Sequence, residues 1–219
     1  ERPLNPGEPM RPLDPGVKVS RFVTYLDGIN QGTYGYLPIV DTFLDKLAQA
    51  SPPDILIVKG IIPYSISNNP LTANNPFAFL WRLVDSFKST VPRFPIGLII
   101  NLRNLYAVMV SADARYGPIQ NRGLAQVLYD SLRYHGYEPG SGVPITLVGF
   151  SGGGQMSMGA VPYLQRATEA PIEVISLSGV ISGNTGAMQA SRLYHLSGSQ
   201  DPVEKLGAIL FPARWPIAL

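Results

Sequence analysis

The sequence predicts an α/β fold with a doubly wound, mostly parallel sheet and a helical insertion. Apolar runs such as "ILIV" at 55–58 are continuous rather than alternating, which is typical of strands buried on both faces. Segments with apolar residues at helical spacing separate these runs, and such alternation indicates a parallel sheet covered on both sides. In sheets of this kind, chemistry is expected where strands end and helices begin.

The elements follow from the pattern in chain order. "ERPLNPGEPMRPLDPG" carries five prolines and two glycines, so we expect a proline-rich arm or linker over 1–17 and one α/β domain over 18–219. A helical, lid-like insertion is expected over about 75–117. The remaining predicted elements are a strand over 19–26, a helix over 37–50, a strand from 55, a helix over 118–135, a strand over 143–150, a helix over 152–169, and strands within 171–181 and 191–201.

Composition excludes several kinds of function. Charged residues make up 15 % of the chain, are scattered along it and leave a net charge of +2. This gives no argument for a nucleic-acid partner. The absence of cysteine excludes disulfides and thiolate metal sites, and two histidines exclude a histidine-rich metal site, so we expect no metal and no cofactor. No apolar run reaches 18 residues, so we expect a soluble domain without a membrane span; no signal-peptide pattern opens the chain. The compartment and the oligomeric state stay open.

The glycine-rich stretch around Ser151 is the clearest candidate for chemistry. Residues 149–153, "GFSGG", fit G-x-S-x-G between a predicted strand and a predicted helix, the setting of a nucleophile elbow. Small residues let the strand and helix backbones approach, and the amino end of the helix favours an anion beside the hydroxyl. The alternative is a glycine-rich turn without chemistry or one that holds a phosphate. A P-loop is excluded because G-K-[ST] is absent.

The order of elements and this motif resemble the α/β-hydrolase fold superfamily, the esterase, lipase and thioesterase-like serine hydrolases, from Val19 to about Asp201. The resemblance implies Ser151 as nucleophile, then an acid after a later strand, then a histidine after the last strand. Asp201, in "LYHLSGSQDP", matches the acid, which would orient an imidazole. Alternatively, or in addition, Asp201 caps a following helix.

A tetrahedral intermediate also needs amide donors for its oxyanion. The amide of Gly152 is one expected donor. By position, the resemblance suggests that the second comes from the loop after the first strand, at Gly28 or Ile29, although Asp-Gly is also an ordinary turn pair. Polar side chains of the same loop would line a substrate pocket: Asn30, Gln31, Tyr34 and Tyr36.

The expected histidine is missing. His195 precedes Asp201 by six residues and His135 ends a predicted helix, so we interpret both as structural. The eighteen residues after Asp201 contain none. Either the chain is a piece of a longer protein whose base lies beyond Leu219, or it keeps the fold without the reaction, as a binding or scaffold domain.

The predicted function is hydrolysis of a carboxylic ester or thioester with an apolar acyl group, through an acyl-serine intermediate. The alternatives are a catalytically incomplete binding or scaffold domain and a transferase that uses the same intermediate. Apolar residues in the 75–117 insertion suggest a lipid-like acyl substrate, or simply pack the insertion onto the core. Membrane contact has little support, because Arg103 is the single basic residue of "PIGLIINLRNLYAVMVSA".

Overall fold

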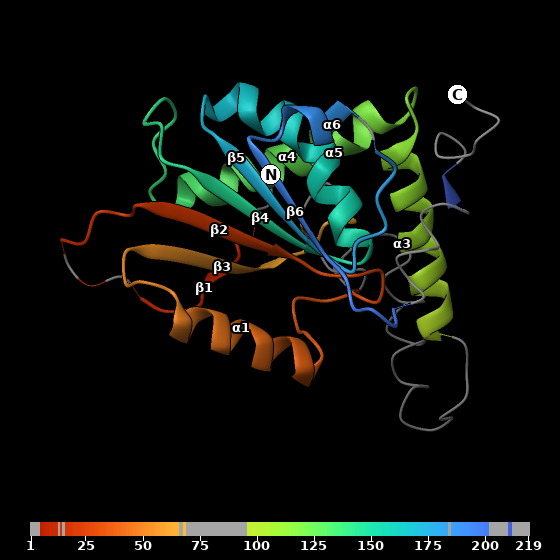
Figure 1. Cartoon of the computed structure of the whole chain (residues 1–219), viewed down its shortest axis with the longest axis horizontal. Coiled ribbons are helices and arrows are strands. Elements are labelled where there is room, and N and C mark those ends of the chain that lie inside the picture. Colours follow the sequence, from red (N-terminus) through yellow and green to blue (C-terminus); the bar gives the residue numbers. More distant parts are fainter. Residues whose placement is uncertain are drawn as a thin grey trace.

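The computed structural model of this chain describes residues 5–12, 14, 16–65, 68, 96–183, 185–201 and 210–211. In these residues a six-stranded sheet has the order β1-β3-β2-β4-β5-β6 (Figure 1). Every neighbouring pair is parallel except β1 and β3, which are antiparallel. The prediction of an α/β protein with a mostly parallel sheet is therefore confirmed. The strands are β1 (Glu8–Pro9), β2 (Arg21–Leu26), β3 (Ile55–Ile61), β4 (Ile145–Phe150), β5 (Ile172–Leu177) and β6 (Arg192–Leu196).

Helices cover both faces of the sheet. They are α1 (Pro38–Ala50), α3 (Ile96–Ala112), α4 (Gly117–Tyr134), α5 (Gly152–Thr168) and α6 (Thr185–Gln189). Figure 1 shows α1 on one side of the sheet and α4, α5 and α6 on the other. The side chains of β2 point alternately to the two faces of the sheet and so belong to two apolar clusters. Val23 and Tyr25 pack with Leu44 of α1, whereas Phe22 and Leu26 belong to the larger core under α4 and α5.

Part of the proline-rich arm belongs to the sheet rather than forming a free linker. Glu8 and Pro9 pair with Lys59 and Val58 of β3, and the Met10 amide donates to the carbonyl of Ile57 at 2.8 Å. Proline is tolerated there because β1 is the outermost strand and needs no donor on its free side. The arm thus shields one edge of the sheet.

The second part of the predicted insertion is a helix that lies at the end of the sheet. Residues 75–95 lie outside the described residues, whereas α3 begins at Ile96. Figure 1 shows α3 beyond the end of the sheet at which β2 and β4 finish. No helix among the described residues combines the length and apolar character needed to cross a bilayer.

Candidate active site

Ser151 occupies a strained bend between β4 and α5. Its backbone has φ 52° and ψ −120°, a conformation that L residues rarely adopt. The Ser151 amide donates to the Leu177 carbonyl of β5 at 2.9 Å, and the Ser151 carbonyl accepts from the amides of Gly154 (3.0 Å) and Val180 (3.2 Å). Such strain persists only where the surroundings over-determine it, and these contacts on both sides provide that constraint.

The glycines of the motif allow three backbones to meet. A Cβ added at Gly149 would lie 2.5 Å from the carbonyl oxygen of Gly153. A Cβ added at Gly153 would contact the carbonyl oxygen of Leu26 and lie 2.7 Å from that of Asp27. Because each of these neighbours is backbone, no side chain can turn away to make room. The end of β2, the end of β4 and the start of α5 therefore require glycine at both positions.

The loop after β2 lies against this bend. A Cβ added at Gly28 would lie 3.4 Å from the Cβ of Ser151, and one added at Gly152 would lie 2.8 Å from the Cγ2 of Ile29. The structure thus brings together the predicted nucleophile and the three residues predicted to bind an oxyanion. The positive end of the dipole of α5 faces the serine. This arrangement is suited to stabilising a negative charge.

A buried carboxyl group lies behind the loop. Asp27 is 1 % exposed; its Oδ1 accepts a hydrogen bond from the Tyr25 hydroxyl at 3.0 Å, and its main-chain carbonyl accepts one from the Tyr64 hydroxyl at 3.0 Å. Burial raises the pKa of Asp27, while the Gly28 amide and the Tyr25 hydroxyl act in the opposite direction. From the sequence, Asp27-Gly28 is interpreted as a turn or loop pair, which gives no sign that this carboxyl group is buried. The signal missed there is an aspartate that ends an apolar strand two residues after a tyrosine.

Two side chains of α3 hold the loop from the outer side. Asn104 Nδ2 donates to the carbonyls of Ile29 (2.7 Å) and Gln31 (2.8 Å). Arg103 donates to Asn104 Oδ1 at 2.8 Å and to the Tyr64 carbonyl at 3.1 Å. Sequence reasoning did not connect Asn104 to the site, although a polar residue within an apolar helix was a usable signal.

The residues predicted to line a pocket lie in two different settings: one is exposed beside the bend, and the two tyrosines bind backbone groups. Asn30 is exposed and lies beside Gly28, since a Cβ added there would be 3.2 Å from Asn30 Oδ1. The Tyr34 hydroxyl donates to the Asn68 carbonyl at 2.7 Å, and the Tyr36 hydroxyl accepts from the Gly60 amide at 2.7 Å. Both tyrosine hydroxyls therefore fasten the loop to β3 and the segment after it.

Asp201 follows β6 at the same edge of the sheet. Its amide donates to the Gly198 carbonyl at 3.0 Å, which closes a turn after the strand. Since β5 lies between β4 and β6, the ends of β4 and β6 are about 10 Å apart at ordinary strand spacing. Asp201 lies in the turn beyond Leu196, the last residue of β6. Residues 202–209, which include any helix that Asp201 would cap, lie outside the described residues.

Both histidines of the sequence have other partners. His195 lies opposite Ser176 in the β5–β6 register, and its Nδ1 is 3.1 Å from the Ser176 Oγ. His135 is the C-cap residue of α4, where its amide donates to the Ser131 carbonyl at 3.1 Å. Burial lowers the pKa of His135, and the backbone of Pro6 and Gly7 opposes this. These contacts account for both residues without a role at Ser151.

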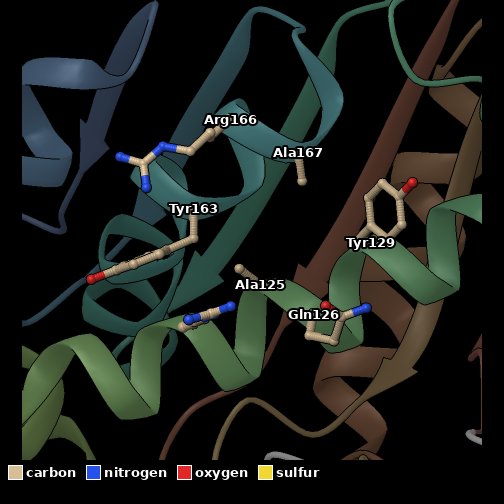
Figure 2. A pocket seen from close by; sticks show the side chains of 7 residues that line it. Ala125, Gln126, Tyr129, Tyr163, Arg166 and Ala167 are labelled. Atoms are coloured by element: carbon tan, nitrogen blue, oxygen red, sulfur yellow. The ribbon is translucent and has the colours of Figure 1, made fainter.

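A groove between α4 and α5 lies away from the bend (Figure 2). Arg166 lies in the last turn of α5, about 20 Å along the helix from Ser151 at 1.5 Å per residue. The groove has a volume of about 360 Å³ and is lined by Arg122, Ala125, Gln126, Tyr129, Tyr163, Arg166 and Ala167. Its distance from Ser151 separates it from the chemistry considered above.

Within the described ranges, no cluster of three or more His, Cys, Asp or Glu side chains could hold a metal ion. No family model, curated protein or solved structure matches the chain. Function is therefore inferred from the chemistry of the bend at Ser151.

Proposed function

We propose that the chain is a serine hydrolase-like domain of the α/β-hydrolase fold superfamily, acting on a carboxylic ester or thioester. The observation that carries this proposal is the backbone of Ser151, with φ 52° and ψ −120° directly between a strand and a helix. Holding a non-glycine residue there costs about 1–3 kcal/mol, which glycine would largely avoid. The Cβ of Ser151 lies close to Gly28 in the loop after β2, so a hydroxyl at this position would be held near the amides of that loop, and this would explain why the strain is kept.

The proposed reaction begins with attack of Ser151 Oγ on the carbonyl carbon of the substrate. The new C–O bond places a negative charge on the carbonyl oxygen, which the amides of Gly152 and Ile29 stabilise, whereas the Gly28 amide acts on the Asp27 carboxyl group. A base takes the hydroxyl proton and passes it to the leaving alcohol or thiol as the C–O or C–S bond breaks. Water then hydrolyses the acyl-serine. Neither histidine of the sequence lies at Ser151, so the base is an imidazole supplied from elsewhere, as by imidazole added to the buffer, and Asp201 orients it.

Apolar side chains next to the bend support an apolar acyl group. Phe150 is 37 % exposed and lies beside Gly28, while Ile29 and Val108 both face the position that a Cβ of Gly152 would occupy. An acyl chain leaving the reacting carbonyl along Phe150 would gain apolar contact, whereas Val108 is buried and packs against Gly152.

A second candidate function is a hydrolase-like binding or scaffold domain. It is favoured by one observation: the sequence has two histidines, and both are accounted for by contacts at Ser176 and at the end of α4. In that case an ester would bind at the bend without being cleaved.

Release of p-nitrophenol from acetate, butyrate and octanoate esters separates the two functions. With imidazole in the buffer, we expect a burst of about one equivalent per chain, faster with the longer acyl groups, and none from Ser151→Ala. Ser178→Ala is the matched control, since Ser178 also has a positive φ (46°) and follows β5, the neighbouring strand. A burst that survives in Ser151→Ala contradicts the nucleophile. Absence of any burst from the unmodified chain favours the binding domain.

A further inference from the structure

The described part of α3 buries the polar side chains of Asn104 and Ser111 and exposes several apolar ones. Asn104 is fully buried, whereas Leu102 and Tyr106 are 55 % and 69 % exposed. Burying an amide side chain is unfavourable unless its donors and acceptor are paired. Both donors of Asn104 Nδ2 are used by the loop after β2, and Oδ1 accepts from Arg103. The inward position of Asn104 is therefore explained by the loop that it binds.

Asn104 binds two carbonyls of the turn that follows β2, the turn that carries the proposed oxyanion donors. In a planar trans peptide the carbonyl and the next N–H point in opposite directions. Fixing the Ile29 carbonyl therefore fixes the Asn30 amide. One residue earlier, the Gly28 carbonyl accepts from the Gln31 amide at 3.1 Å, which fixes the Ile29 amide in the same way.

The first peptide of the loop is held by the same network. The Asp27 carbonyl accepts from the Tyr64 hydroxyl, so the direction of the Gly28 amide is fixed as well. Arg103 in turn donates to the Tyr64 carbonyl and to Asn104, which joins the two supports. Hydrogen bonds from a guanidinium are stronger than neutral ones.

We propose that Asn104 is a positioning residue that holds the turn of residues 28–31, which carries the proposed oxyanion donors, in place for the oxyanion formed at Ser151. This inference rests on the proposed function. Asn104 acts through the Ile29 and Gln31 carbonyls and need not contact the substrate. Loss of one oxyanion donor, or its displacement by about 1 Å, typically lowers the rate about 100-fold. We therefore expect a fall of that size when the clamp, the two hydrogen bonds from Asn104 to the Ile29 and Gln31 carbonyls, is removed.

The test uses Asn104→Leu, which keeps the approximate volume and removes both donors, in the full chain with imidazole present. Reaction of Ser151 with a fluorophosphonate is measured as an inactivation rate constant and a separate half-saturation concentration. Ser111→Ala is the matched control, because Ser111 is a buried polar residue of α3 whose hydroxyl donates to Asn121 on α4 rather than to the loop. We expect the rate constant to fall about 100-fold in Asn104→Leu, with the half-saturation concentration within about threefold.

Hydrogen exchange of the amides of residues 28–32 gives a readout independent of any reaction. It should accelerate in Asn104→Leu and stay unchanged in Ser111→Ala. Unchanged exchange, or a rate constant equal to that of Ser111→Ala, overturns the inference. If Asn104→Leu does not fold, the nearly isosteric Asn104→Asp provides the same comparison. If the unmodified chain does not react at Ser151 while exchange still accelerates, the proposed function fails and the clamp on the loop stands as structural.

Discussion

Adding one methyl group at Gly153 tests the contact between α5 and β2. The new Cβ would contact the carbonyl oxygen of Leu26 and lie 2.7 Å from that of Asp27 and 2.9 Å from the carbonyl carbon of Leu26. All are backbone atoms, so the helix or the strand end must move. Overpacking of this kind costs about 3 kcal/mol. Alanine is favoured over glycine in helices by about 1 kcal/mol, so Gly153→Ala should lose about 2 kcal/mol of unfolding free energy.

The loss is measured by urea denaturation followed by circular dichroism. With a slope of about 2 kcal/mol per molar urea, it moves the midpoint down by about 1 M and leaves the slope unchanged. Gly35→Ala is the control, because its backbone lies outside the left-handed region and its added Cβ would be 3.8 Å from the nearest atom, Thr33 Oγ1. That variant should stay within about 0.5 kcal/mol of the unmodified chain. A Gly153→Ala variant as stable as Gly35→Ala would refute the close approach at the bend.

Further predictions concern charge at the site. Burial raises the pKa of Asp27 above its unfolded value of about 3.9, so the stability contributed by its retained proton is full below that pH and is lost as pH rises through the folded pKa. As the pH rises above about 4, the unmodified chain should therefore lose unfolding free energy relative to Asp27→Asn. Urea titrations at several pH values measure both, and a constant difference between the two proteins would contradict this. Imidazole should accelerate the reaction of Ser151 with a fluorophosphonate and saturate, because Asp201 would hold the added base. Asp201→Asn should weaken that saturation, and an equal imidazole dependence in both proteins would remove Asp201 from the site.

The parts of the fold that the sequence predicts are those that depend on residues close together in the chain. The apolar run at 55–58 lies in β3, and the helix predicted over 37–50 is α1. Its buried face is formed by Leu44 and Ala48, whereas the apolar Ile39 is 76 % exposed. The bend at Ser151 was also accessible, since its glycines and its flanking strand and helix are contiguous in the chain.

Contacts between distant segments were not predictable in this way. Asn104 and the loop it binds are more than 70 residues apart, and nothing in the periodicity of α3 specifies the Ile29 and Gln31 carbonyls as its partners. Pairing of Glu8 and Pro9 with β3 depends on which edge of the sheet is open, which is a property of the assembled strands. Tyr34 and Tyr36 have polar tips that suit a pocket, but their hydroxyls bind backbone groups of the β3 region.

The most direct measurement is the location of a fluorophosphonate adduct by mass spectrometry of peptides from the labelled chain. The account predicts one adduct, on the Ser151 hydroxyl, that disappears in Ser151→Ala and remains in Ser178→Ala. A label on another residue, or equal labelling of the Ser151→Ala protein, would contradict it.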